Sequence, residues 1–348
     1  MTVDTMGVGA ALAALPEQLA SAHERAGGID GSQLPDRADV DQVVVLGMGG
    51  SGVAGDIVQA AGSATLPVPL TTLKQYRTPA YVGPRTLAFA VSYSGDTEET
   101  LAMASGALQA GAHLIAVSRG GALAALAREH GALHVPCAPD IVMPRFALGE
   151  LLAPILVVLF RLGLMPEVHA GLLMAQQQLQ HRRDQCRPDV ELARNPAREL
   201  ARRIDRTIPI VYGAGALGGV AAMRWKQSVN ENAKAPAYWN QFPELDHNEL
   251  CGWGQHGDVT RQVFTLVELR HGLEHPQLER RVTATREMID EAVHQVLTVD
   301  AAGEGRLAQL LDLVHLGDWT SYYLALANDV DPGPIDAISQ LKSRLAQP

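Results

Sequence analysis

The stretch VVVLGMGGSG, residues 43–52, joins a run of consecutive aliphatic residues to a turn that is rich in glycine. Aliphatic residues without polar alternation indicate a strand that is buried on both faces, as strands of parallel sheets are. The stretch IPIVYGAG, residues 208–215, repeats this pattern, and apolar runs at 86–91 and 113–117 also end in turns that contain glycine. Because helix-length segments separate these runs, the sequence predicts βαβ units and an α/β fold of parallel sheets flanked by helices.

The two glycine-rich turns indicate an internal duplication. The chain has 348 residues, which is enough for two domains of ordinary size. We expect an N-terminal domain over residues 1–185 and a C-terminal domain over 186–348, with the connection inside the polar, arginine-rich segment 176–206. Further strands are predicted at 262–269 and 280–285, and helices at 8–26, 97–110, 121–130, 151–164 and from about residue 306.

Composition excludes several classes of function. Hydrophobic residues make up 47% of the chain, and the formal net charge of −10, without basic clusters, argues against nucleic-acid binding. The three cysteines are far apart and odd in number, so neither a disulfide framework nor a CxxC metal site is expected. No apolar run is long enough to span a membrane, and the N-terminus lacks a signal-peptide pattern. We therefore expect a cytoplasmic protein with no metal, membrane or nucleic-acid partner.

Both glycine-rich turns, at 47–52 and 213–218, match the GxGxxG pattern of dinucleotide-binding folds. That fold also needs an acidic residue about 20 positions further on, at the end of the second strand. Residues 67–75 contain none, and Glu231 lies in an Asn-Glu-Asn-Ala-Lys context that is not typical of a strand end. An NAD-dependent dehydrogenase is therefore a weaker alternative, and no cofactor is expected.

The segment SYSGDTEE, residues 92–99, follows a predicted strand and places three hydroxyl groups, those of Ser92, Ser94 and Thr97, around one glycine. Hydroxyl donors at a helix N-terminus can bind an anion without any lysine or arginine. The alternative is an ordinary Ser/Thr helix cap with a capping box. The residue types alone leave both interpretations open.

Two polar segments, 224–234 and 243–249, contain Glu231 and His247, which are candidates for general acid/base chemistry. Chemistry that moves a proton between two carbons requires a base, such as a carboxylate, and a second group that can act as an acid. The alternative is a charged helix followed by an Asn-rich loop.

These motifs together resemble one family of enzymes. Residues 92–99 are similar to the SxSGxTxE phosphate loop of sugar-isomerase (SIS) domains, and 47–52 resembles the GMGGS turn of phosphoglucose/phosphomannose isomerases. Further segments resemble that family's PR pair and its NENAK, PELNHNE, DxxSxYLA, DPTPV and LK motifs, namely 144–145, 230–234, 243–249, 318–325, 331–335 and 341–342.

The resemblance implies two SIS-type domains and a homodimeric isomerase that interconverts glucose or mannose 6-phosphate with fructose 6-phosphate through a cis-enediol. Glu231 would carry the proton, Arg145 would stabilise the enediolate, and His247, from the neighbouring subunit, would assist ring opening. Without the resemblance, Arg145 would be taken for a surface arginine after a proline turn. The remaining roles implied are phosphate binding by Ser51, Ser92, Ser94 and Thr97, proximity to the sugar for Gly49 and Gly50, and ring opening by Lys342.

The sequence departs from the family pattern at two positions: Asp246 replaces an asparagine, and Gly333 replaces a common threonine. Loss of the threonine hydroxyl leaves the choice between glucose and mannose open. A non-catalytic sugar-phosphate-binding regulator on the same scaffold is a further alternative. Such a protein could lose Glu231, His247 or Lys342, and the presence of all three favours an enzyme.

Overall fold

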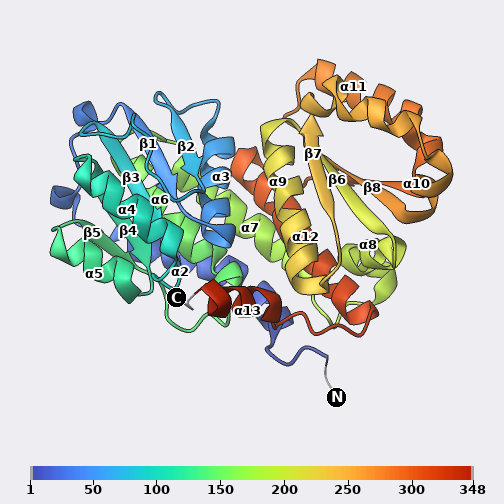
Figure 1. The fold of residues 1–348 in the computed structure, drawn as a ribbon, viewed down its shortest axis with the longest axis horizontal. Helices are drawn as coiled ribbons and strands as arrows, with labels where there is room; N and C mark the ends of the chain where they lie inside the picture. The colour runs from blue at the N-terminus through green and yellow to red at the C-terminus, as the bar shows by residue number, and fades with distance from the viewer. Residues whose placement is uncertain (1–2, 346–348) are drawn as a thin grey trace. The chain divides into compact units, whose positions relative to one another are not determined.

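Residues 3–345 are described by the computed structural model, and they form two units, each with its own parallel sheet (Figure 1). The N-terminal unit consists of Ala14–Gln180 and Ala302–Asp312. The C-terminal unit consists of the described residues up to Ala13, His181–Ala301 and residues 313–345. Helices α7 and α12 contribute residues to both units, and the predicted α/β fold with two parallel sheets is confirmed.

The N-terminal sheet has the order β2-β1-β3-β4-β5, with all strands parallel. The predicted strands at 43–46, 86–91 and 113–117 are confirmed as the three central strands. The edge strands β2 and β5 were not predicted, because they are short and partly exposed and lack a continuous apolar run. The strands are β1 Gln42–Leu46, β2 Leu70–Leu73, β3 Thr86–Val91, β4 His113–Ser118 and β5 Leu133–Pro136.

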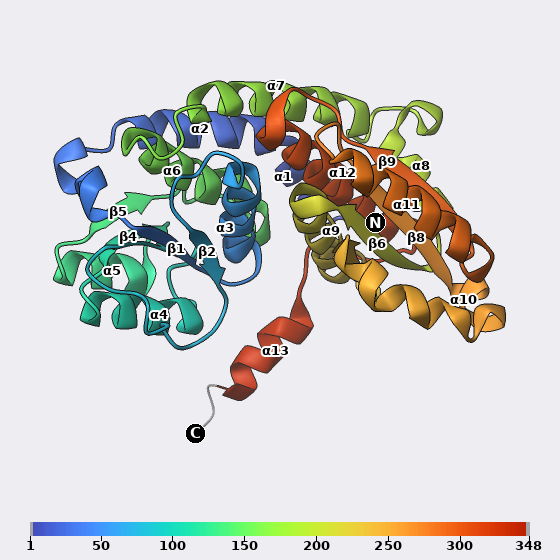
Figure 2. The same ribbon diagram turned by 90° about the horizontal axis from the view of Figure 1, so that it is seen from above.

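Helices cover both faces of this sheet, with α4 and α5 on one face and α2 and α6 on the other (Figure 2). After β1 the chain crosses to β2 on one side, and after β3 it crosses to β4 on the other side. Because both crossovers are right-handed, α3 and α4 lie on opposite faces of the sheet. Ala88 and Ala90 of β3 pack in one core with Met103 of α4. The helices are α2 Leu15–Gly27, α3 Gly49–Gly62, α4 Glu98–Gln109, α5 Gly121–Glu129, α6 Leu148–Arg161 and α7 Val168–Cys186.

The C-terminal sheet has the order β7-β6-β8-β9, which matches the first four positions of the N-terminal sheet and confirms the predicted duplication. Its strands are β6 Ile208–Ala214, β7 Tyr238–Phe242, β8 Phe264–Arg270 and β9 Gln295–Asp300. The remaining helices are α1 Val8–Ala13, α8 Pro196–Ile204, α9 Gly215–Ser228, α10 Gly257–Val263, α11 Pro276–Ile289, α12 Gly305–Ala327 and α13 Asp336–Leu345.

The strand predicted at 280–285 is wrong, because this segment lies inside α11. Leu278, Val282, Thr285 and Ile289 are the buried residues of α11, and their spacing of three to four residues is that of one helix face. Within 280–285 alone, Val282 and Thr285 are the only members of that face, so the short window did not show the helical period. The strand predicted at 262–269 is observed as β8.

In each sheet, the first strand lies between the second and the third, so the chain turns away in opposite directions at neighbouring strand ends. Ligands of open α/β sheets bind in the crevice at this position, outside the carboxyl ends of the strands. Among the helices of residues 3–345, none combines the length and apolarity that crossing a bilayer requires. Over the same residues, no three His, Cys, Asp or Glu side chains are grouped for metal binding.

Candidate functional site

The first glycine-rich turn brings three parts of the N-terminal unit together. A Cβ at Gly47 would lie 3.0 Å from the carbonyl oxygen of Val91, so the turn after β1 contacts the end of β3. A Cβ at Gly50 would lie 3.2 Å from the Cα of Arg145. Gly49, which begins α3, has a φ of +52°, a conformation that side chains other than glycine rarely adopt. Gly49, Gly50 and Arg145 therefore lie near the carboxyl ends of the strands β1 and β3.

The predicted phosphate-binding hydroxyls gather at the same edge. The hydroxyls of Ser92 and Thr97 are 2.9 Å apart, and the backbone N–H of Tyr93 donates to the Oγ of Ser51 over 3.4 Å. The Oγ of Ser94 accepts from the backbone N–H two residues further on. Thr97 occupies the N-cap position of α4, yet its side chain makes no capping hydrogen bond. The capping-box interpretation is therefore wrong, and the Thr97 hydroxyl faces Ser92 instead.

Arg145 is buried, with only 5% of its surface exposed, so the interpretation as a surface arginine is wrong. Its guanidinium lies 4.6 Å from the ring centre of Phe146, and Nη1 donates to the sulfur of Met143 over 2.9 Å. Arg145 is thus a buried cation close to the first glycine-rich turn, since a Cβ at Gly50 would lie 3.2 Å from its Cα.

Tyr93, a member of the hydroxyl-rich loop, holds the segment that leads to Arg145. Its hydroxyl donates to the carbonyl of Ala138 over 2.8 Å and accepts from the N–H of Ile141 over 3.1 Å. Burial raises the pKa of Tyr93, so the phenol stays neutral and keeps its donor at physiological pH. The loop that presents the hydroxyls thus also fixes the approach to Arg145.

Lys74 is a basic residue beside the turn that the sequence analysis did not identify. It directly follows β2, and its Cε would lie 2.9 Å from a Cβ at Gly52. Its ammonium pairs with Asp56 of α3 at 2.5 Å, and burial raises the pKa of Asp56 against the opposing effect of Lys74. The end of β2 therefore carries a lysine where a dinucleotide fold needs a carboxylate, which argues against NAD binding.

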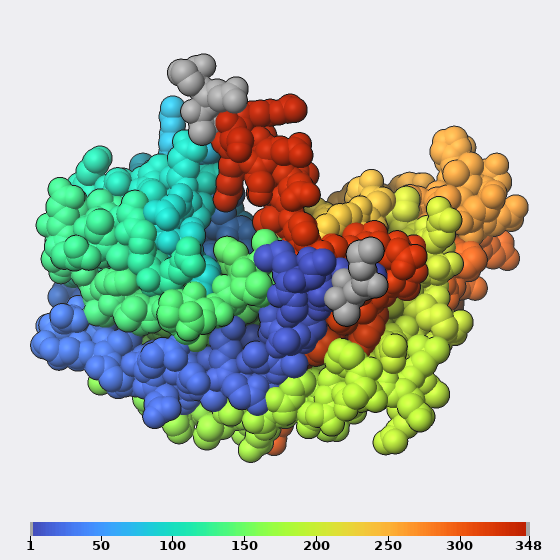
Figure 3. All heavy atoms as spheres, turned by 90° about the horizontal axis from the view of Figure 1, so that it is seen from below, coloured from blue at the N-terminus to red at the C-terminus, as the bar shows by residue number. Residues whose placement is uncertain are grey.

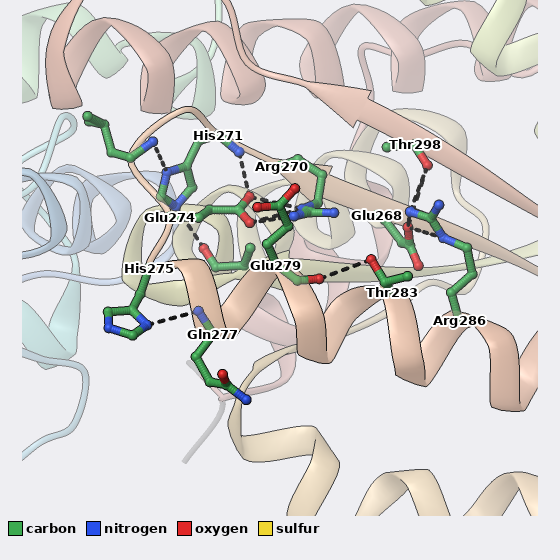
Figure 4. A network of polar contacts seen from close by, with 12 residues as sticks. Glu268, Arg270, His271, Glu274, His275, Gln277, Glu279, Thr283, Arg286 and Thr298 are labelled. Carbon is green, nitrogen blue, oxygen red and sulfur yellow. Dashed lines mark hydrogen bonds and ion pairs between the residues drawn. The ribbon is translucent and has the colours of Figure 1, made fainter.

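The second glycine-rich turn has different chemistry around it. Arg270, the last residue of β8, pairs with Glu274 at 2.6 Å, and the Glu274 carboxylate also accepts the backbone N–H of His271 over 2.7 Å (Figure 4). His271 in turn bonds the carbonyl of Ala214 through Nε2 over 3.0 Å. The Glu274 carboxylate thus already accepts hydrogen bonds from the donors of this loop. Of the two turns, it is the first that is lined with hydroxyls and suited to a phosphate.

Glu231 lies on a π-helical turn, Val229–Ala233, that continues α9. It lines a pocket of about 540 Å³ together with Asn230 and Lys234. The opposite wall consists of Val330, Asp331 and residues 334–338. π-helical turns are rare in helices, and those that occur are often found at functional sites. Glu231 is therefore a half-buried carboxylate at the wall of a cavity, which is the placement that a general base requires.

A buried polar network fixes the turn that carries Glu231. The side chains of Arg224 and Asp318 are 3% and 4% exposed, and they form an ion pair at 3.1 Å between α9 and α12. Ser228 also donates to Asp318, and the Nδ2 of Asn232 donates to the Oγ of Ser321 over 2.9 Å. The polar segment is therefore not a solvated charged helix, because Arg224 is buried in its ion pair and the buried side chains of Ser228 and Asn232 bond to α12 at the two ends of the π-helical turn.

His247 and Lys342 lie on different elements of the C-terminal unit. His247 ends a short 3-10 helix, Glu244–His247, and is exposed. Lys342 lies on α13, none of whose residues is buried, and this helix stands at the surface (Figure 3, red). Of the described residues, neither His247 nor Lys342 lines the pocket of Glu231.

Comparisons with known proteins cover most of the chain. Residues 193–345 match the family description "Bacterial phospho-glucose isomerase C-terminal SIS domain". A bifunctional phosphoglucose/phosphomannose isomerase of Caldicellulosiruptor bescii is 35% identical over 96% of this chain and 97% of its own length. An enzyme of the same name from Aquifex aeolicus is 30% identical over 87% and 90%. The crystal structure of a hypothetical protein from Thermus thermophilus shares the fold with a TM-score of 0.72 at 19% identity, over 98% of this chain and 91% of that one.

The Asp318→Asn variant tests the buried network. It leaves Arg224 buried without its full counter-charge, and breaking a buried ion pair typically costs about 3–5 kcal/mol. We expect a lower free energy of unfolding, measured by urea denaturation. The matched control is Asp300→Asn, which changes an exposed aspartate of β9. Equal urea midpoints for the two variants would show that buried Arg224 does not need Asp318 as its counter-charge.

Proposed function

This chain belongs to the family of bifunctional phosphoglucose/phosphomannose isomerases, and we propose that it interconverts glucose 6-phosphate, mannose 6-phosphate or both with fructose 6-phosphate. It is a sugar-phosphate isomerase by family. The observation that carries the proposal is the hydroxyl cluster at the N-terminus of α4, where Thr97 faces Ser92 instead of capping its helix. The direct test is an NMR assay that starts from fructose 6-phosphate and follows both aldose products. Formation of neither aldose would overturn it.

In this proposal the 6-phosphate binds to Ser51, Ser92, Ser94 and Thr97. Their hydroxyls donate to the phosphate oxygens, and the positive end of the α4 dipole stabilises the negative charge. Gly49 and Gly50, without side chains, let the backbone approach the sugar. Such a site suits a chain of net charge −10, because it depends on local donors and not on a basic surface.

The proposed reaction moves one proton between two carbons. Glu231 takes the proton from C2 of the open-chain aldose and returns it to C1 of the cis-enediol, while a hydroxyl proton moves from O2 to O1. Arg145 stabilises the negative charge that develops on the enediolate. His247 and Lys342 assist the opening of the sugar ring. Glu231 is supported in this role by its place at the wall of a pocket.

A homodimer and a cytoplasmic location complete the proposal. His247 is exposed on its own unit, which suits a residue that serves the site of a second subunit. All three cysteines, Cys137, Cys186 and Cys251, are free thiols, which suits a reducing compartment. The non-catalytic regulator remains the alternative from another class, and it would bind fructose 6-phosphate without turnover.

Replacing Ser94 and Thr97 with alanine tests the phosphate site. Each lost donor to a charged group typically costs roughly 1.5–3 kcal/mol, so we expect KM for fructose 6-phosphate to rise at least tenfold with a smaller change in kcat. Ser105→Ala, a hydroxyl further along α4, is the control. Equal affinity of the wild type for fructose and fructose 6-phosphate, measured by calorimetry, would exclude a phosphate site.

Glu231→Gln tests the proton transfer. Glutamine keeps the shape of the side chain but cannot accept the proton, so kcat should fall by about 10² to 10⁴ while substrate binding changes little. The exposed Glu291→Gln serves as control. Deuterium at C2 of the aldose should appear partly at C1 of the ketose and partly in solvent. Complete retention under all conditions would indicate a hydride shift and would remove Glu231 from this role.

Mixing inactive Glu231→Gln with inactive His247→Ala tests whether subunits share sites. In a mixed dimer with shared sites, one site receives Glu231 from one subunit and His247 from the other, both intact. Random mixing should therefore restore about a quarter of the wild-type activity in a two-fold symmetric dimer. Sedimentation of the mixture identifies the species. A fully active monomer, or a dimer without recovery, would contradict the shared site.

A further inference from the structure

The segment Pro243–Glu249, which carries His247, is short and is anchored on both sides of the histidine. Leu245 is almost fully buried and packs in one core with Val282 of α11. The backbone N–H of Asn248 donates to the carbonyl of Leu245 over 3.3 Å. His247 itself is exposed between these anchored residues, so its backbone is held while its ring faces outward.

Asp246 provides the anchor on the N-terminal side of the histidine. Its side chain is 6% exposed, and each carboxylate oxygen accepts one hydrogen bond from α11. Thr285 donates to Oδ1 over 2.8 Å, and the guanidinium of Arg281 donates to Oδ2 over 3.1 Å. An asparagine at this position has one acceptor oxygen and could not offer a separate oxygen to each donor. The carboxylate therefore fits the pair of donors that α11 presents.

Glu249 provides the anchor on the C-terminal side. Its carboxylate accepts hydrogen bonds from the hydroxyl of Tyr212 on β6 and from the side-chain amide of Asn240 on β7. The indole N–H of Trp253 donates to the same tyrosine oxygen over 3.1 Å. Burial, followed by the hydrogen bond to Glu249, raises the pKa of Tyr212, so the phenol remains a donor. The segment around His247 is thus tied to three elements, α11, β6 and β7.

We propose that Arg281 and Thr285 are positioning residues that hold His247 through Asp246. This inference rests on the proposed function, in which His247 assists ring opening. A catalytic group must be held within about 0.5 Å of its working position by packed and hydrogen-bonded neighbours. His247 has an exposed ring, so the anchored backbone of its segment determines where the imidazole is presented. Loosening Asp246 should slow ring opening without removing a group that touches substrate.

The kinetic consequence distinguishes a positioning role from a loss of folded protein. When proton transfer from C2 limits the rate, glucose 6-phosphate labelled with deuterium at C2 turns over more slowly than the unlabelled sugar. If ring opening becomes limiting in a variant, this primary isotope effect on kcat falls toward one. A smaller fraction of active enzyme lowers kcat but leaves the isotope effect unchanged.

The experiment uses the full-length enzyme with the double variant Arg281→Gln/Thr285→Val. The matched control is Arg280→Gln/Thr283→Val, which makes the same changes at exposed positions of α11, where Thr283 bonds the carbonyl of Glu279 (Figure 4). We expect about a tenfold lower kcat, KM within about twofold and a reduced isotope effect for the first pair, with wild-type values for the second. Thr285→Ser, which keeps the hydroxyl, should retain most of the activity.

A second measurement does not depend on activity. Amide hydrogen exchange of residues 245–249, followed by mass spectrometry, should be faster in the Arg281/Thr285 variant than in the Arg280/Thr283 variant. Unchanged exchange, or a lower kcat with an unchanged isotope effect, would overturn the positioning role. If the wild-type enzyme fails to convert fructose 6-phosphate, the proposed function is wrong. Amide exchange then still shows whether α11 anchors the segment.

Discussion

Parallel pairing of the strands is the constraint on which the rest of the structure depends. In a parallel sheet every strand ends at the same edge, so the turns that follow β1 and β3 must be neighbours. Right-handed crossovers then send the chain to opposite faces at this point, which is where ligands of open α/β sheets bind. Gly47, in the turn after β1, lies so close to the end of β3 that a Cβ on it would be 3.0 Å from the carbonyl oxygen of Val91. A side chain at Gly47 would separate the glycine turn from the hydroxyl-rich loop.

The two units show how one strand order supports two kinds of chemistry. In the N-terminal unit the loop after β3 carries the hydroxyls of Ser92 and Thr97, and buried Arg145 supplies a positive charge beside the first glycine-rich turn. In the C-terminal unit the loop after β8 is closed on itself by Arg270 and Glu274. An internal carboxylate satisfies the same kind of backbone donor that a bound phosphate would use. Duplication therefore preserved the scaffold, while the residues at the strand ends diverged.

The central strands could be predicted from sequence, because a strand covered on both faces must be continuously apolar, as Val43–Leu46 and Thr86–Val91 are. Edge strands such as Leu70–Leu73 are exposed in part and carry no such signal, and for this reason Lys74 was missed. The hydroxyl loop could be predicted because Ser92, Ser94 and Thr97 are close together in the sequence. The pairing of Arg224 with Asp318 spans 94 positions, so it depends on the packing of α9 on α12 and not on any local pattern.

The ion pair of Arg224 with Asp318 is better explained by the backbone geometry that it helps to fix near Glu231 than by a contribution to the free energy of unfolding. Removing an arginine and an aspartate from water is costly, and well-packed apolar residues in their place are often as stable or more stable. Asp318 of the pair nevertheless also accepts a hydrogen bond from Ser228, the residue that precedes the π-helical turn, and π-helical turns are rare in helices. Ser228 and Asn232 join the two ends of that turn to Asp318 and Ser321, so the network specifies one orientation for the turn as a whole. An apolar core at this place would fill the same volume without fixing that orientation. The ion pair and the hydrogen bonds of Ser228 and Asn232 therefore constrain the backbone of the turn that carries Glu231.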